Sequence, residues 1–256
     1  MIRVERRECG IVWITIDRPQ ARNAMTFAMW DELGEIARTL DADDAVRVVV
    51  FTGAGGSAFV SGTDIGEFRG FTADDGVAYE ARMDRVMTAL DAIRVPTIAA
   101  IGGVCTGGGA AIAGACDIRI GSPGTRVGIP IARTLGNVIA LKNCARLATL
   151  IGIDAVKFLI LTGRLVDASE ALRIGFLNDF APSDGELLAR AQATAMAMTE
   201  LAPLTLRATK EMCRRLAAAT PLPNAEDLIR LCYGSNDFGS GVEAFLGKTR
   251  VTWTGT

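Results

Sequence analysis

Short, unbroken apolar runs rich in β-branched residues recur along the first half of the chain. Three of them, at 11–17 (IVWITID), 46–52 (VRVVVFT) and 97–101 (TIAAI), predict buried strands. Between the first two, apolar residues recur at helical spacing after Thr26, which predicts an amphipathic helix. The residues that share its apolar face are Trp30, Leu33, Ala37 and Leu40.

Helical periodicity returns at 73–93 and then dominates the second half of the chain. After a predicted turn at 127–131, two more helices are expected at 139–151 and 154–161. The apolar positions predicted to share one face of the 73–93 helix are Val77, Met83, Val86, Met87, Leu90 and Ile93.

The segment 166–175 has an N-cap signal, a helical stretch and a C-cap glycine, and a strand is expected next, at 176–180. From Asp184 onward the pattern is almost wholly helical. Strands alternating with helices, followed by helices alone, predict an α/β protein. We expect a parallel β/α core over residues 1–182 and a helical region over 183–256.

The apolar stretch 95–121 predicts a strand, a glycine-rich turn, a short helix and a further strand. The glycine triplet 107–109 opens this helix, whose other residues are mostly Ala and Ile. The first turn of a helix leaves backbone N–H groups without intrahelical partners, and the helix dipole adds partial positive charge there. Glycines let a carbonyl oxygen approach those donors, so the stretch favours stabilisation of an oxyanion.

Two structural alternatives compete for this stretch. Residues 95–116 carry no charge, which is typical of a membrane span, but Pro96 and six glycines argue against a lipid-facing helix. The second alternative is a glycine turn that serves only to connect a strand with a helix. The remainder of the chain favours a site over a purely structural turn.

Composition narrows the class of protein. With 256 residues, half of them hydrophobic, the chain can bury a full core in one large domain or in one domain with a helical appendage. A net charge of −2 with interspersed signs disfavours nucleic acid and anionic membranes as partners. The amino terminus, MIRVERRECG, has no apolar signal segment, so we expect a cytoplasmic protein. The six cysteines form no C-x-x-C pair and are interpreted as buried free thiols.

The chain contains no histidine. This excludes Ser-His and Cys-His nucleophile pairs and histidine proton shuttles, and it removes the commonest metal ligand. We expect no metal site. Acid or base chemistry must use Asp, Glu, Lys, Tyr, Cys or water.

Two glycine motifs resemble nucleotide sites only weakly. Residues 53–58 (GAGGSA) fit a loose dinucleotide fingerprint, but an extended segment follows where a Rossmann fold needs a helix. Residues 241–249 (GVEAFLGKT) have one residue too many for a phosphate loop and follow no strand. Neither NAD nor a nucleoside triphosphate is expected as a cofactor.

Taken together, these segments resemble the crotonase superfamily, and in particular the enoyl-CoA hydratase/isomerase family, from Val12 to about Trp253. Two early segments carry the resemblance, RPQARNA at 18–24 and AFVSGTDI at 58–65. The later matching segments are the glycine-rich block at 102–118, the helix at 166–175 and the tail at 235–248.

The resemblance implies a spiral of ββα units, with C-terminal helices that assemble the chain into trimers or dimers of trimers. It implies an acyl-CoA substrate, no separate cofactor, and an oxyanion hole made by the backbone N–H groups of Ser61 and Gly108. Phe245 and Lys248 would reach the nucleotide of a neighbouring subunit. The other implied CoA contacts are Ala21, Arg22, Gly62, Thr63 and Asp64.

The chain departs from the family where hydratases carry their two glutamates, because Ala111 and Ile131 occupy those positions. Neither side chain can transfer a proton, so ordinary water addition is not expected. The candidates for a replacement acid or base, chosen because they lie near family pocket segments, are Glu67, Asp84, Arg133 and Asn137.

The departure leaves three functions open. The first is an enzyme that uses the oxyanion hole and a relocated group on an unusual thioester, by isomerisation, decarboxylation, dehalogenation or C–C cleavage. The second is a catalytically silent acyl-CoA-binding protein. The third is a thioester hydrolase in which the Ser61 hydroxyl acts as the nucleophile.

Overall fold

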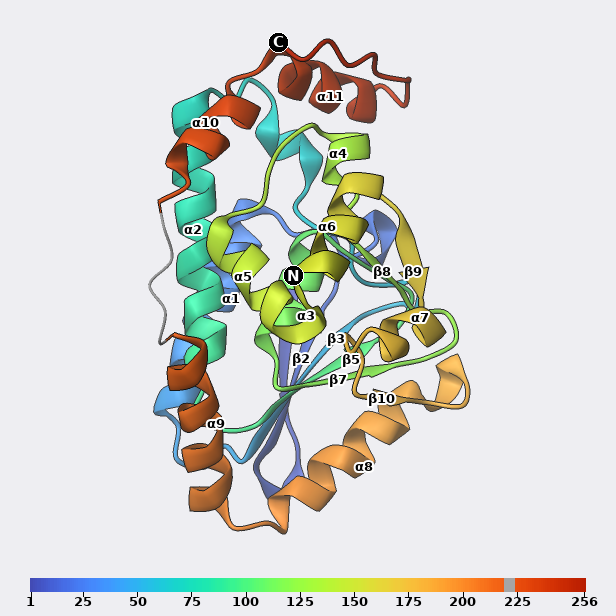
Figure 1. Cartoon of the computed structure of the whole chain (residues 1–256). Coiled ribbons are helices and arrows are strands. Elements are labelled where there is room, and N and C mark those ends of the chain that lie inside the picture. The colour runs from blue at the N-terminus through green and yellow to red at the C-terminus, as the bar shows by residue number, and fades with distance from the viewer. Residues whose placement is uncertain (219–223) are drawn as a thin grey trace.

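The computed structural model describes residues 1–218 and 224–256 and contains two β-sheets surrounded by helices (Figure 1). The larger sheet has the order β1 (Ile2–Arg6), β2 (Ile11–Ile16), β3 (Val48–Gly53), β5 (Thr97–Ile101), β7 (Ile118–Gly121) and β10 (Asp179–Phe180). The smaller sheet has the order β4 (Ala58–Val60), β6 (Val104–Thr106), β8 (Arg126–Gly128) and β9 (Leu165–Asp167).

The two sheets are built by a repeating chain path. Strands β3, β5 and β7 of the larger sheet are each followed by a short strand, β4, β6 or β8, of the smaller sheet. Helices α2 (Ala73–Ala92) and α3 (Gly108–Ala115) return the chain from β4 and β6 to the larger sheet, whereas after β8 the chain first adds β9 to the smaller sheet and then reaches β10 through α7 (Ala168–Arg173). All neighbouring strands of the larger sheet are parallel except β1 and β2. The predicted α/β class and the ββα repeat are therefore confirmed.

The predicted helices up to residue 175 are present in the predicted order. The α-helices are α1 (Phe27–Ala42), α2 (Ala73–Ala92), α3 (Gly108–Ala115), α4 (Ile131–Thr134), α5 (Leu141–Ile151), α6 (Ile153–Thr162), α7 (Ala168–Arg173), α8 (Leu187–Thr199), α9 (Pro203–Ala217), α10 (Glu226–Tyr233) and α11 (Asn236–Leu246). The 3-10 turns are η1 (Glu8–Gly10), η2 (Pro19–Ala21), η3 (Ile65–Phe68) and η4 (Asp184–Glu186).

Side-chain caps fix the start of the two long helices. The Thr26 hydroxyl accepts from the Met29 N–H, so α1 begins one residue later and buries its predicted apolar face. Thr72 and Asp75 form a capping box at the start of α2. The predicted face of α2 needs one correction, because Val77 is half-exposed whereas Gly76 and Glu80 are buried.

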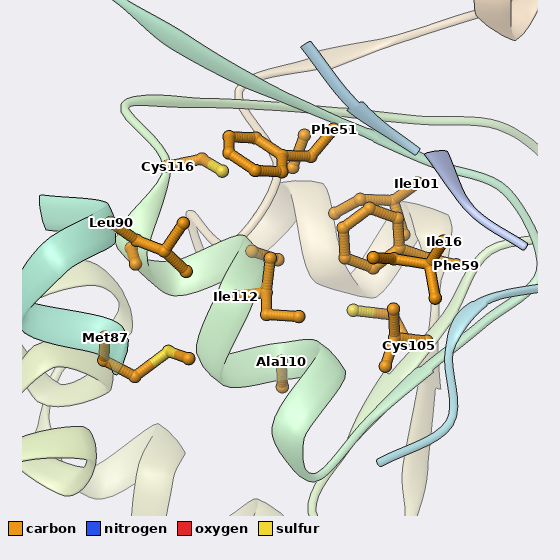
Figure 2. Close-up of a cluster of buried hydrophobic side chains, with 14 of the residues drawn as sticks. Ile16, Phe51, Phe59, Met87, Leu90, Ile101, Cys105, Ala110, Ile112 and Cys116 are labelled. Carbon is orange, nitrogen blue, oxygen red and sulfur yellow. The ribbon is translucent and has the colours of Figure 1, made fainter. Parts of the chain in front are cut away.

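The small-residue helix α3 lies in the centre of the core. Figure 2 shows Ile112 between Met87 and Leu90 of α2 on one side and Phe59 and Ile16 on the other. A Cβ atom at Gly109 would lie 2.0 Å from the Val60 carbonyl oxygen, so only glycine allows α3 to touch β4. This contact explains why the predicted helix is both short and rich in small residues.

Three sequence expectations require correction. Only 179–180 of the predicted strand 176–180 pairs, because the N–H groups of Phe176 and Leu177 both donate to the Ala171 carbonyl and close the end of α7. The predicted turn at 127–131 contains part of β8 and the start of α4. All six cysteines are free, but Cys9 and Cys213 are exposed rather than buried.

The C-terminal helices occupy three different places. Helix α8 packs on the larger sheet, where Leu187, Ala191 and Ala195 join a second core cluster with Ile11 and Trp13. Helix α9 has no buried residue, and α10 lies along α2 with α11 beyond it (Figure 1). Residues 219–223 of the predicted helical region lie outside the described residues. Among the described helices, none is long and apolar enough to cross a membrane.

Candidate active site

A cavity of about 770 Å³ opens beside the N-terminus of α3. Its walls come from the η2 loop, the segment after β4, helix α2, the segment 129–139 and the end of α11. The sequence separation of these segments is large, but the two sheets and α2 bring them together. The cavity contains most of the residues that the sequence analysis singled out.

Ser61 and Gly108, the predicted oxyanion donors, both line this cavity. Their two segments touch backbone to backbone, because a Cβ at Gly108 would lie 3.7 Å from the Cα of Gly62. Gly62 and Gly107 have φ values of 119° and 52°, which favour glycine. Gly108 is the first residue of α3, where a helix presents N–H groups without intrahelical acceptors.

The Ser61 N–H already has an acceptor in the ligand-free chain. It donates to the Arg22 carbonyl oxygen at an N···O distance of 3.2 Å, which is at the long end for such a bond. A ligand oxygen must therefore share or replace this bond. At Gly108 the space is limited by Trp30, because a Cβ atom on Gly108 would lie 2.6 Å from the indole ring.

The predicted CoA-contacting residues all line the same cavity. Arg22 and Lys248 are exposed, which places their cationic groups at its mouth. Asp64 is committed to local structure, because one oxygen accepts from the Arg18 guanidinium at 2.6 Å and the other caps η3. The residues in this group are Ala21, Arg22, Gly62, Thr63, Asp64, Phe245 and Lys248. The role of the last two toward a neighbouring subunit stays a prediction.

Ala111 and Ile131, the positions without glutamates, also line the cavity. Ala111 lies in α3 one turn after its start, and Ile131 begins α4 after Pro130. Other apolar side chains extend this wall, namely Met83, Met87, Ile129, Ile139 and Leu147. The region beside the predicted oxyanion hole is therefore largely apolar.

Of the four candidate replacement groups, only Asn137 lines the cavity. Glu67 accepts from the backbone N–H of Phe27 at the start of α1, so it has a structural partner. Asp84 lies in a separate groove and is paired with Lys142 at 3.7 Å. Arg133 is exposed and its stem packs against Gly163. These three residues are close in sequence to segments that line the cavity, but in the folded chain they do not line it themselves.

The sequence analysis missed Glu80, a carboxylate from α2 that lines the cavity and is only 4% exposed. Its Oε1 accepts from the Tyr233 hydroxyl at 2.7 Å, and its Oε2 accepts from the Ala140 N–H at 2.8 Å. Burial raises the pKa of Glu80 to about 7. The sequence held one signal for the burial of Glu80: its helical spacing from Gly76, Met83 and Met87 puts it on the buried face of α2.

A second polar side chain completes this corner of the cavity. The Asn137 Nδ2 donates to the Tyr233 hydroxyl at 3.1 Å, so Asn137, Tyr233 and Glu80 form a chain of hydrogen bonds. The Asn137 Oδ1 is buried and has no hydrogen-bond partner in the described part of the chain. The cavity thus combines apolar walls with one connected polar group of side chains.

Comparisons with known proteins agree with the geometry. The family model described as enoyl-CoA hydratase/isomerase matches residues 6–256. A short-chain-enoyl-CoA hydratase of Clostridium acetobutylicum is 31% identical over 248 residues, which cover 96% of this chain and 94% of that protein. A probable enoyl-CoA hydratase of Mycobacterium tuberculosis is 34% identical, with 99% and 97% covered.

Solved structures extend the same comparison. An enoyl-CoA hydratase/carnithine racemase from Magnetospirillum magneticum is 34% identical and has a TM-score of 0.81, with 100% of this chain and 96% of that chain covered. A methylmalonyl-CoA decarboxylase has a TM-score of 0.88 over 100% and 98% of the two chains but is 24% identical, so it supports the fold alone. The chain belongs to the enoyl-CoA hydratase/isomerase family.

Proposed function

We propose that this protein is an enzyme that binds an acyl-CoA thioester and reacts it through an enolate. Family membership, the large cavity and the two glycine segments support this proposal. The observation that carries it is the contact between the Ser61–Gly62 segment and the N-terminus of α3 on the cavity wall. In the proposed complex the Gly108 N–H donates to the ligand oxygen, and the Ser61 N–H joins it by sharing or replacing its bond to the Arg22 carbonyl oxygen.

The proposed mechanism uses the backbone at the point where negative charge develops. The thioester carbonyl oxygen accepts from the N–H groups of Gly108 and Ser61, and the dipole of α3 adds to the stabilisation. Removal of a proton from the α carbon then gives an enolate whose oxygen carries the charge. The apolar walls exclude water, which strengthens these electrostatic interactions.

The proposed reaction differs from the ordinary hydration performed by family members with two glutamates. Ala111 and Ile131 contribute no acid or base to the cavity. Each positioned acid or base contributes a factor of about 10² to 10⁴. Hydration of crotonyl-CoA by this protein is therefore expected to be at least about 10³-fold slower than hydration by a family member with both glutamates.

Isothermal titration with CoA and with acyl-CoAs of increasing chain length tests the proposal, together with a crotonyl-CoA hydration assay. We expect binding of at least one acyl-CoA and hydration at least about 10³-fold below a hydratase control. An absence of binding to every acyl-CoA up to millimolar concentration would contradict the proposal. Hydration at the rate of the control would show that Ala111 and Ile131 do not occupy the glutamate positions.

A further inference from the structure

We propose that Glu80 is the acid/base residue that moves the α proton of the acyl group, and that Tyr233 is its positioning residue. This inference rests on the proposed acyl-CoA function. It answers the question that the apolar side chains at 111 and 131 raise, namely which group of this chain transfers the proton. It is carried by the position of Glu80 in the cavity wall and by the two bonds that hold its carboxylate.

The Glu80 carboxylate accepts two hydrogen bonds and keeps further acceptor sites. The Tyr233 hydroxyl and the Ala140 N–H each donate to one oxygen, from α10 and from the residue before α5. An ionised carboxylate has about four acceptor sites, so two remain for a proton. The bonds fix the orientation of the side chain, and burial on α2 keeps it out of bulk water.

The other ionisable side chains in the cavity wall are unsuited to this step. Asp64 is paired with Arg18 and caps η3. The Tyr79 hydroxyl shares a hydrogen bond with Thr63, and burial raises the pKa of Tyr79 above its ordinary value, so it stays protonated. Arg22 and Lys248 lie at the exposed mouth. Within the described cavity lining, Glu80 is the carboxylate without a cationic partner.

The surroundings of Glu80 place its pKa where a base can also act as an acid. Burial is the main cause of the rise to about 7, and the charge of Asp84, one turn along α2, adds to it. The bonds from Tyr233 and from the Ala140 N–H act in the opposite direction. Lys142 and Arg146 lie beside Asp84 and offset the charge of that carboxylate. At neutral pH both forms of Glu80 are therefore populated, which suits proton transfer.

The proposed step needs no additional reactant. The Glu80 carboxylate forms a bond to the α hydrogen, and the electron pair of the broken C–H bond becomes the new C=C bond of the enolate. The carbonyl π pair moves to the thioester oxygen, where Gly108 and Ser61 donate. Protonated Glu80 then returns a proton to the α carbon, which restores the thioester with an exchanged hydrogen. Where the acyl chain has a β,γ double bond, the enolate is extended to the γ carbon, and return of the proton there gives the α,β-unsaturated isomer.

A purely structural role for Glu80 must be distinguished from this one, because the carboxylate also connects α2 with α10 and the start of α5. The test is exchange of the α hydrogens of butyryl-CoA for deuterium in D₂O, followed by proton NMR. The variants are Glu80→Gln and, as a matched control, Glu67→Gln, which removes a carboxylate outside the cavity lining. Titration with butyryl-CoA and thermal unfolding accompany each variant.

We expect the wild-type chain to catalyse exchange and Glu80→Gln to lose it by about 10²-fold or more. Affinity for butyryl-CoA is expected to stay within about threefold for both variants, and Glu67→Gln should exchange at nearly the wild-type rate. Loss of exchange in Glu80→Gln with retained affinity supports the proposal. Wild-type exchange by Glu80→Gln, or binding without exchange by the wild-type chain, overturns it. Failure of the wild-type chain to bind any acyl-CoA instead contradicts the proposed function.

The pH profile of exchange gives a second readout that a structural role would not change. Exchange should rise with pH through about 7, because the carboxylate form accepts the proton. Tyr233→Phe removes a bond that lowers the pKa of Glu80, so the midpoint should move to higher pH. This variant tests the proposal even if Glu80→Gln is unstable. An unchanged midpoint in folded Tyr233→Phe contradicts the assignment of Glu80.

Discussion

At the scale of single residues, backbone donors and one buried carboxylate account for the chemistry we propose. The sequence could suggest Ser61 and Gly108 as donors because glycine segments that need positive φ or close approach leave a recognisable pattern, and their role toward a thioester stays a prediction. Glu80 was not, because a single carboxylate in a helix is most often exposed. Its partners Tyr233 and Ala140 are 153 and 60 residues away in the sequence, so only the fold shows which groups bond to it.

The backbone role of Ser61 and Gly108 leads to a mutational prediction. Gly108→Pro removes the donor, whereas Gly108→Ala retains it and controls for the crowding of Trp30 by a new Cβ at 2.6 Å. We expect Gly108→Pro to exchange the α hydrogens of butyryl-CoA about 10²- to 10³-fold more slowly than Gly108→Ala. Ser61→Ala should remain close to wild type. A large loss in folded Ser61→Ala would instead indicate a hydroxyl nucleophile and thioester hydrolysis.

At the scale of elements, longer strands could be predicted from the sequence and very short ones could not. The continuous apolar runs gave β2, β3 and β5 to within about two residues. The strands of the smaller sheet are three residues each, which is too short for a periodic pattern. Their path depends on close backbone contacts such as the one at Gly103, where a Cβ would lie 2.1 Å from the Ser57 carbonyl oxygen.

Helix α9 carries the prediction that belongs to this scale. Two of its leucines point outward, with Leu204 75% and Leu216 76% exposed, and none of its residues is buried in the single chain. We propose that this face packs against further copies of the chain, as the resemblance implies for the C-terminal helices. Leu204→Glu combined with Leu216→Glu should lower the mass measured by light scattering from a trimer or hexamer to a monomer.

The matched control for α9 is Val4→Glu, which replaces an exposed apolar residue on the edge strand β1. This variant should keep the mass of the wild-type chain. A monomeric wild-type chain, or an oligomer that survives both leucine substitutions, would contradict the proposed role of α9.

At the scale of the whole molecule, the ββα spiral explains how a largely apolar cavity contains the hydrogen-bonded side chains of Asn137, Tyr233 and Glu80. The sheets place the two glycine segments together, α2 spans the cavity wall, and α10 lies along α2 so that Tyr233 reaches Glu80 (Figure 1). Gly76 permits this packing, because a Cβ there would lie 2.3 Å from the Tyr233 ring. The family and fold class were accessible from sequence motifs, whereas the joining of α2 with α10 required the complete fold.

A crystal structure of the protein with butyryl-CoA bound tests the central claim most directly. We predict that the thioester oxygen lies within about 3.2 Å of the backbone nitrogens of Ser61 and Gly108. We also predict that a Glu80 carboxylate oxygen lies within about 4 Å of the α carbon, close to a reactive geometry. A thioester bound away from both nitrogens, or an acyl chain that leaves Glu80 out of reach of the α carbon, would contradict the account.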